Sequence, residues 1–320
     1  MRPPELRLAR RALLAAGLAA PIAARATLPE PTVERFALWP DAPPGGEGLS
    51  VRDEVVKRSP NGDEDDIAWP HVATPMLTVV SAAQPNGAAV LICPGGGYAR
   101  VATGRRGSAI ARMFAGRGIT AFELLYRLPR DGWAAGPDTP LQDAQRAIRL
   151  IRARGERWGI DPARVGALGF SAGGHLAARL AARAALATYP PVDAADSLSA
   201  RPDVAGLFFA VITMAEPDAH AQSKRELLGG DTSDERVRRF SAENELPAEM
   251  PPTFLSHAAD DPVVPVANSL RMFAALQAAR IPSEMMVFER GGHGLPLARP
   301  DGTAHPWPGL FLDFGRSHGF

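Results

Sequence analysis

The chain has 320 residues, of which 46% are hydrophobic, so it can bury the core of one large domain or two small ones. Its 35 basic residues equal its 35 acidic residues, so the chain has no net positive charge that would attract nucleic acid or anionic membranes. The single cysteine, Cys93, excludes an intramolecular disulfide, and its place in an apolar run predicts a buried structural thiol.

Residues 1–26 have the pattern of an export signal. Arg10-Arg11 closes a basic segment, Ala12 to Ala24 is a short apolar run, and Ala24-Arg25-Ala26 offers small residues where a signal peptidase reads. The apolar run is too short to span a membrane. The arginine pair loosely matches a twin-arginine signal, and a general secretory signal fits the same residues. We therefore expect export to the periplasm or the cell exterior.

Residues 27–74 are rich in proline, glycine and charge, and this composition predicts an irregular N-terminal arm with room for one edge strand. The acidic run at 62–66 is interpreted as a solvated loop, because the carboxylate ligands of known cation loops alternate along the chain.

Strand and helix patterns alternate from residue 75 to the C-terminus. The expected strands are Met76 to Ser81, Ala88 to Cys93, Ile119 to Tyr126, Arg164 to Phe170, Ala205 to Ile212, Thr253 to His257 and Glu284 to Phe288. The expected helices are Ser108 to Arg117, Pro140 to Trp158, Ala172 to Leu186, Pro265 to Ala279 and Trp307 to His318. This alternation predicts one α/β domain over 75–320, with a doubly wound, mostly parallel sheet and helices on both faces. Ligands of such sheets bind beyond the carboxyl ends of the strands.

The pentapeptide Gly169-Phe170-Ser171-Ala172-Gly173 fits the pattern G-x-S-x-G between an expected strand and an expected helix. That context is typical of a nucleophile elbow, in which a tight turn holds the serine above the sheet and small neighbours relieve crowding. A serine hydroxyl needs a base to attack at neutral pH, and the base needs an orienting acid. Ser171 is therefore the candidate nucleophile.

Candidates for the acid and the base follow later strands in the expected chain order. Asp260 and Asp261 come after the strand that ends at His257, and His293 lies among glycines after the next strand. Pro262 confines Asp261 to an extended backbone, which favours it as the acid, while Asp260 stays the alternative. His175 lies on the helix that Ser171 opens, and we interpret it as a packing or hydrogen-bonding residue.

The glycine run Gly95-Gly96-Gly97 predicts an oxyanion hole. Consecutive glycines after a strand leave backbone N–H groups free to face a tetrahedral oxyanion, and we assign Gly96 or Gly97 together with the amide of Ala172. The spacing does not fit a dinucleotide loop, because Arg100 stands where the last glycine belongs. The sequence has no P-loop and no zinc-spaced histidine and cysteine set, so we expect neither cofactor nor metal.

Taken together, these motifs resemble the acetylxylan-esterase-like branch of the α/β-hydrolase superfamily. The residues that carry the resemblance are Pro94 to Tyr98, Tyr126 to Leu128, Asp143 to Ala147, Gly169 to Leu176, Pro251 to Phe254, Asp260 to Pro265 and Gly291 to Gly294. Many relatives have histidine before the triple glycine, where this chain has Pro94. Since the oxyanion-hole donors are backbone N–H groups, we expect the oxyanion hole to work with proline at this position.

The resemblance implies a serine esterase that removes short acyl groups, acetate above all, from xylan-type carbohydrate through an acyl-enzyme. Tyr98 and Trp133 are expected to contact substrate, although a loop-anchoring role fits Trp133 equally well. Roughly 38 residues separate the strands around 211 and 252, which leaves no room for a lipase-sized lid. The alternatives are a general carboxylesterase, a prolyl-oligopeptidase-type serine peptidase and a catalytically silent glycan-binding protein. The peptidase is disfavoured because such enzymes carry a large N-terminal domain.

Overall fold

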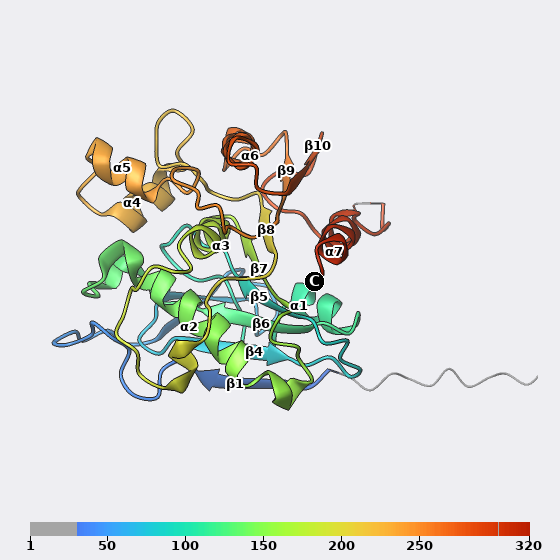
Figure 1. The fold of residues 1–320 in the computed structure, drawn as a ribbon. Helices are drawn as coiled ribbons and strands as arrows, with labels where there is room; N and C mark the ends of the chain where they lie inside the picture. The colour runs from blue at the N-terminus through green and yellow to red at the C-terminus, as the bar shows by residue number, and fades with distance from the viewer. Residues whose placement is uncertain (1–30, 300) are drawn as a thin grey trace, which may run out of the picture.

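The computed structural model describes residues 31–299 and 301–320, so the expected export signal at 1–26 lies outside the described residues. Eight strands form one sheet in the order β1-β4-β6-β5-β7-β8-β9-β10 (Figure 1). The pairs β1–β4 and β4–β6 are antiparallel, and the other neighbours in this sheet are parallel. The predicted α/β fold with a mostly parallel sheet is confirmed.

The strands of this sheet are β1 (Val33–Ala37), β4 (Met76–Val80), β5 (Ala89–Cys93), β6 (Thr120–Leu125), β7 (Val165–Phe170), β8 (Ala205–Phe208), β9 (Thr253–Ala258) and β10 (Ser283–Phe288). The helices are α1 (Ala109–Ala115), α2 (Thr139–Ala153), α3 (Ala172–Ala182), α4 (Ala221–Leu228), α5 (Asp234–Phe240), α6 (Ala267–Ala278) and α7 (Trp307–Ser317). No helix in the described ranges has the length and apolar character that a membrane crossing requires.

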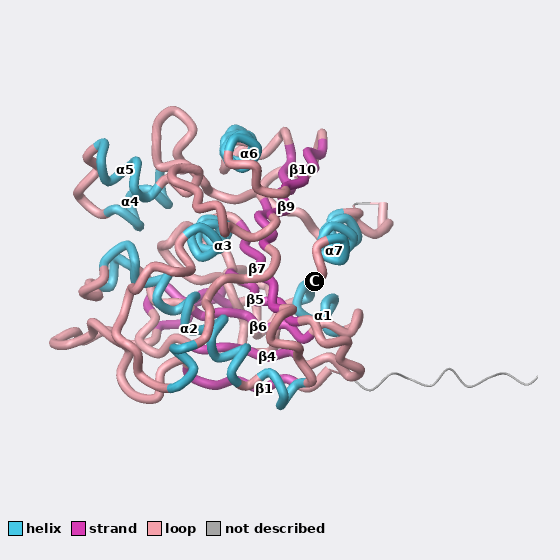
Figure 2. Tube along the Cα trace, viewed as in Figure 1, coloured by secondary structure: helices cyan, strands magenta, loops and turns pink. Residues whose placement is uncertain are grey.

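Helices cover both faces of the sheet, as Figures 1 and 2 show. Helices α2 and α3 lie on one face, where Leu141, Ile148 and Leu176 join the larger apolar core. Helices α1 and α7 lie on the other face, where Phe114 and Phe311 pack edge to face with ring centroids 6.1 Å apart. The strands between these layers are buried on both sides, because parallel crossovers place helices over each face. Cys93, at the end of β5, is buried, which agrees with the prediction of a structural thiol.

The N-terminal arm is more regular than its composition predicts. Besides β1 at the edge of the main sheet, it forms a two-stranded sheet from β2 (Glu54–Lys57) and β3 (Ile67–His71). Trp69 of β3 is buried, and its Nε1 donates to the carbonyl of Thr103 at 2.9 Å. The carboxylate of Asp65 accepts the N–H groups of Arg105 and Arg106 at 2.7 and 2.8 Å. The arm therefore holds the loop that leads into α1.

Two differences from the expected elements lie after the serine motif. Strand β8 ends at Phe208 because the next residue, Phe209, has a left-handed backbone with φ of 37° that leaves the sheet direction. The helices α4 and α5 were not expected, because each is short and mainly polar and carries little apolar periodicity. Both belong to the segment that connects β8 to β9, and α4 supplies part of the site described below.

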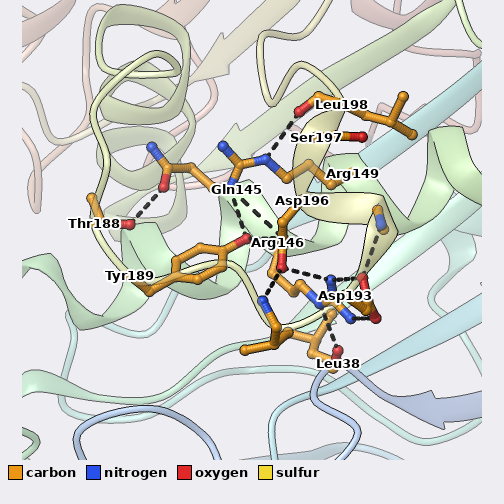
Figure 3. Close-up of polar contacts among 12 residues, drawn as sticks. Leu38, Gln145, Arg146, Arg149, Thr188, Tyr189, Asp193, Asp196, Ser197 and Leu198 are labelled. Atoms are coloured by element: carbon orange, nitrogen blue, oxygen red, sulfur yellow. Dashed lines mark hydrogen bonds and ion pairs between the residues drawn. The ribbon is translucent and has the colours of Figure 1, made fainter.

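A buried charge network ties α2 to a short 3-10 turn at Ala194–Ser197 (Figure 3). The guanidinium of Arg146 is 3.1 Å from the carboxylate of Asp196, and both side chains are 1% exposed. Arg146 also donates to Asp193 at 2.7 Å, and the hydroxyl of Tyr189 donates to Asp196 at 2.7 Å. A buried charge is tolerated only when it is paired and hydrogen-bonded, and this network supplies both. It fixes α2, on which α3 packs.

Candidate active site

Ser171 occupies the strained turn between β7 and α3. Its backbone has φ of 55° and ψ of −124°, a left-handed conformation that a non-glycine residue adopts only when its surroundings enforce it. The crowding explains the glycines on either side. A Cβ on Gly169 would come within 2.1 Å of the carbonyl of Gly173, and one on Gly173 within 2.1 Å of the carbonyl of Cys93. This geometry is the expected nucleophile elbow, with the serine beyond the carboxyl end of β7.

Ser171, His293 and Asp261 form one hydrogen-bonded chain. Nε2 of His293 is 2.9 Å from Oγ of Ser171, and Nδ1 is 2.8 Å from Oδ2 of Asp261. A carboxylate only accepts, so Nδ1 carries the proton and the neutral ring is free to accept from the serine hydroxyl through Nε2. The structure thus brings the three residues together in the order that base-assisted attack by a serine requires.

Asp261 is held from several directions. Its Oδ1 accepts the N–H groups of Val263 and Val264 at 2.8 and 3.0 Å, and its side chain is fully buried. Burial acts to raise the pKa of this carboxyl, but the hydrogen bonds from His293 and from the two backbone N–H groups outweigh it and leave the pKa below its ordinary value. Asp261 is therefore an anion across the neutral range and can orient the imidazole.

Asp260, the alternative acid, points to a different partner. Its Oδ1 accepts the N–H groups of Gly291 and Gly292, both at 2.8 Å. Since these glycines directly precede His293, Asp260 holds the histidine loop instead of the imidazole. The two neighbouring carboxylates thus fix the backbone and the side chain of the same histidine.

His257, which precedes Asp261 in the chain, is a further support of that carboxylate. It is fully buried, and its Nε2 lies 3.2 Å from Oδ2 of Asp261 and 3.0 Å from the carbonyl of Val264. Both partners are acceptors, so Nε2 carries a proton, and Nδ1 accepts from the hydroxyl of Ser269 at 2.7 Å. The only sequence signal for this role is its place on the strand that leads into Asp261.

The glycine loop after β5 lies against the nucleophile. A Cβ on Gly95 would be 3.1 Å from Cβ of Ser171, and Gly96 and Gly97 have φ of 137° and 65°, which glycine adopts without strain. Among the described residues, no recorded hydrogen bond uses the amides of Gly96, Gly97 or Ala172. These amides are therefore free to donate to a group bound at Ser171, and their role as an oxyanion hole stays a prediction.

Tyr98 and Trp133 do not lie where substrate contact requires them. Tyr98 is 1% exposed, and its hydroxyl is 2.8 Å from Nδ1 of His175. Trp133 is 5% exposed and stacks on the guanidinium of Arg127, 4.7 Å from the ring centroid. Neither residue is part of the cavity wall. Both rings are packed in the interior of the fold, and this burial gives no support to the expected substrate contact.

His175 links the glycine loop to α3 in a defined protonation state. Burial lowers its pKa to about 3, with the charge of Arg179 acting in the same direction. The neutral ring donates from Nε2 to the carbonyl of Phe240 at 2.7 Å, so Nδ1 accepts from the hydroxyl of Tyr98. The interpretation of His175 as a hydrogen-bonding residue agrees with this arrangement, which anchors the oxyanion loop to the nucleophile helix.

A cavity of about 760 Å³ opens at Ser171 and His293. Its wall includes four residues to which sequence reasoning gave no role: Arg58 of the arm, Glu123 of β6, and His220 and Gln222 at the start of α4. Burial, followed by the charge of His293, lowers the pKa of His220. Of the four, only Glu123 has a sequence signal, since it is a lone charge inside an apolar strand.

Comparison with known proteins places this geometry in a family. The profile of the BD-FAE family matches residues 79–276, which is more than half of the chain. The chain belongs to the BD-FAE family. As a member of that family, it is an α/β-hydrolase, and the matched range contains Ser171 and Asp261 but ends before His293.

Individual relatives agree with this assignment. The chain is 36% identical over 212 residues to endo-1,4-beta-xylanase B of Butyrivibrio fibrisolvens and 31% identical over 215 residues to the acetylxylan esterase of Xylanibacter ruminicola. Each match covers 66% of this chain but only 33% and 41% of the relative, so the chain spans less than half of either protein.

The solved structure of an acetyl ester-xyloside bifunctional hydrolase from Caldicellulosiruptor lactoaceticus has the same fold over most of this chain. It superposes with a TM-score of 0.69 and 32% identity over 90% of this chain and 97% of that one. A truncated carbohydrate esterase from gut microbiota, at 20% identity and a TM-score of 0.65, supports the fold alone.

Proposed function

We propose that this BD-FAE family member is a serine esterase that hydrolyses short-chain carboxylic esters. The observation that carries the proposal is the chain from Asp261 through His293 to Ser171, with hydrogen bonds of 2.8 and 2.9 Å, beside a glycine loop with unused amides. In this proposal His293 takes the proton of Ser171 as its hydroxyl oxygen attacks the ester carbonyl. The amides of Gly96 or Gly97 and Ala172 stabilise the oxyanion.

The second half of the cycle uses the same groups. His293 gives its proton to the departing alcohol, which leaves an acyl group on Ser171. Water then attacks the acyl-enzyme while His293 accepts its proton, and the acid leaves as the serine is restored. Asp261 stays ionised throughout and stabilises the imidazolium that forms in each half. Each backbone N–H donor of an oxyanion hole typically contributes about two to three powers of ten in rate.

We propose acetylated xylan-type carbohydrate as the substrate. The support is the 31% identity to an acetylxylan esterase and the 32% identity to an acetyl ester-xyloside hydrolase of nearly the same length. The cavity volume of about 760 Å³ leaves space for a sugar beside an acetyl group.

Acetate release from acetylated xylan and from p-nitrophenyl acetate tests both parts of this function. The wild type should hydrolyse both, and Ser171→Ala should lose about three or more powers of ten in kcat on each. Turnover of p-nitrophenyl acetate alone would leave a general carboxylesterase and remove the xylan assignment. Turnover of neither ester would favour the peptidase, which a proline-containing peptide substrate tests, or a silent glycan-binding protein, which xylan binding without hydrolysis would reveal.

We also propose export through the leader at residues 1–26. The support is the pattern of Arg10-Arg11, the apolar run and the small residues at Ala24 and Ala26. Expression of the full chain, followed by N-terminal sequencing of the periplasmic or secreted protein, should find a chain that begins at Thr27. Full-length protein retained in the cytoplasm would contradict export, and dependence on the twin-arginine machinery would separate the two routes.

A further inference from the structure

The catalytic cavity is much larger than a short acyl group. Its volume of about 760 Å³ lies within the range of about 300–1,000 Å³ of pockets that hold whole small molecules. Beside Ser171 the wall is partly apolar, with Ile92, Phe170 and Leu295, and it also includes a buried carboxyl on β6. The cavity therefore has room for a group larger than acetate, and a carboxyl is part of its wall.

That carboxyl belongs to Glu123, the residue paired with Ile92 of β5 in the parallel register. Register partners in a parallel pair point to the same face, so Glu123 lies among the apolar residues that face α1 and α7. The residue is 2% exposed, and it lines the cavity. A carboxyl here breaks an otherwise apolar surface at the point where substrate can reach it.

The local fold uses only part of the hydrogen-bonding capacity of Glu123. Its Oε2 accepts the N–H of Ser108 at 2.9 Å, and its other hydrogen-bonding contact within the described residues is also with Ser108. Across the same residues, no lysine or arginine lies within ion-pair distance of it, and the charge of Arg112 acts on it only from farther away. A carboxylate offers about four acceptor sites, and burying one without a charged partner is costly. Holding one N–H at the start of α1 does not require a charge.

We propose that Glu123 is a specificity-determining residue that accepts a hydrogen bond from a hydroxyl group of the substrate. The ligand class is an ester that carries a hydroxyl several atoms from the scissile bond, as every partly acetylated sugar does. This inference rests on the proposed esterase function and adds to it the group that selects among esters. The hydroxyl lies on the leaving sugar when acetate is the acyl group, and the same chemistry also fits a hydroxyl at the far end of a longer acyl chain.

The test compares Glu123→Met, which keeps the length of the side chain without its acceptors, with Glu123→Gln, which keeps an acceptor oxygen. The substrates are a monoacetylated methyl xyloside, with hydroxyls on the alcohol, and p-nitrophenyl acetate, with none. A second pair, the p-nitrophenyl esters of 3-(4-hydroxyphenyl)propionate and 3-phenylpropionate, places the hydroxyl on the acyl side. Each kcat/KM is measured on protein whose folding is checked by thermal unfolding.

Glu123→Met should lower kcat/KM for a hydroxyl-bearing ester by about 10- to 100-fold, because a site that pairs with a substrate hydroxyl loses about this much with one hydrogen bond. For p-nitrophenyl acetate, which carries no hydroxyl, kcat/KM of Glu123→Met should stay within about threefold of the wild-type value. Glu123→Gln, unlike Glu123→Met, should keep most of the wild-type preference for hydroxyl-bearing esters, because its amide oxygen can still accept a hydrogen bond. A loss confined to the xyloside places the hydroxyl on the leaving alcohol, and a loss confined to the hydroxyphenyl ester places it on the acyl group.

Asp203→Asn is a control at a carboxyl that, unlike Glu123, is paired with an arginine, Arg152, at 3.1 Å. Asp203 is a carboxyl outside the cavity whose pKa burial raises, and it accepts the N–H of Val165 at 2.8 Å. Its variant should leave the ratio between substrates unchanged. Equal losses on all esters in Glu123→Met would mean a purely structural role and would overturn the inference, as would unchanged selectivity. Wild-type protein that hydrolyses none of the esters would instead overturn the proposed function.

Discussion

Asp260 and Asp261 are chemically identical neighbours that the fold gives different partners. Asp261 meets the imidazole of His293, whereas Asp260 meets the backbone of Gly291 and Gly292. The difference arises from alternation along a short loop, where one carboxylate turns toward the site and the next toward the adjoining loop. Proline after Asp261 is the sequence feature that favours this choice.

The two carboxylates should therefore respond differently to removal. Asp261→Asn should lower kcat by about 10³- to 10⁴-fold, because its amide oxygen stays with the N–H groups of Val263 and Val264, and its NH2 group then donates to the ring and imposes the wrong tautomer. Asp260→Ala should lower kcat far less, by about tenfold, because the variant loses only the hydrogen bonds that position the backbone of the loop before His293. Both constants are read from initial rates on p-nitrophenyl acetate. A larger loss in Asp260→Ala than in Asp261→Asn would reverse the assignment.

His175 should make stability depend on pH. The folded protein lowers its pKa from 6.5 to about 3, so between these values the unfolded chain binds a proton that the folded chain does not. Stability should therefore fall as the pH falls through this window, by up to about 1.4 kcal/mol per pH unit from this residue. His175→Gln can form both hydrogen bonds without titrating. Urea unfolding at pH 7 and pH 5 should show that the free energy of unfolding falls less in His175→Gln than in the wild type. Equal losses in the two proteins would contradict a titrating role for His175.

At the scale of elements, the strand-to-loop junctions are where sequence and structure agree best. Ser171, Asp261 and His293 each follow a strand with strong apolar character, and the carboxyl ends of parallel strands meet at one edge of the sheet. Their convergence could be predicted because topology alone enforces it. Tyr98 and Trp133 could not be placed in this way, since whether an aromatic ring in a loop points to solvent or to the core depends on tertiary packing.

The elements that sequence reasoning missed have weak periodic signals. Helices α4 and α5 are short and mainly polar, and β2 and β3 lie in a segment punctuated by proline and glycine. They matter because Gln222 of α4 and Arg58, just after β2, line the cavity. The proposed catalytic residues could therefore be predicted from motifs, while much of the cavity wall beside them could not.

The network of Arg146 offers a test of element packing that leaves the site untouched. Asp196→Ala removes a fully buried partner of Arg146, and we expect a loss of about 3 kcal/mol in the free energy of unfolding, moderated by the remaining contact with Asp193. Chemical denaturation measures the loss, and kcat of the folded protein should hold. As a control, Asp313→Ala removes an exposed pair with Arg316 and should change little. Similar values for the two variants would contradict a structural role for the network.

At the scale of the whole molecule, the residues that stabilise the fold and the residues of the proposed site lie in different parts of the structure. The cores on the two faces of the sheet and the charge network beside α2 hold the strands in register, and the functional groups lie on loops at one edge. The N-terminal arm joins the two tasks, because β1 extends the sheet while Asp65 holds the loop before α1. Changes in the loops can thus alter substrate choice without dismantling the core.

The most direct test of the proposed serine chemistry is covalent trapping of the nucleophile. An alkyl fluorophosphonate reacts with a serine only when a neighbouring base activates it and an oxyanion site receives the phosphoryl oxygen. We predict one adduct per chain, mapped to Ser171 by peptide mass spectrometry, with esterase activity lost in proportion to labelling. The His293→Ala variant should label far more slowly. Full activity in labelled protein, or activity loss with the adduct on another residue, would contradict Ser171 as the nucleophile.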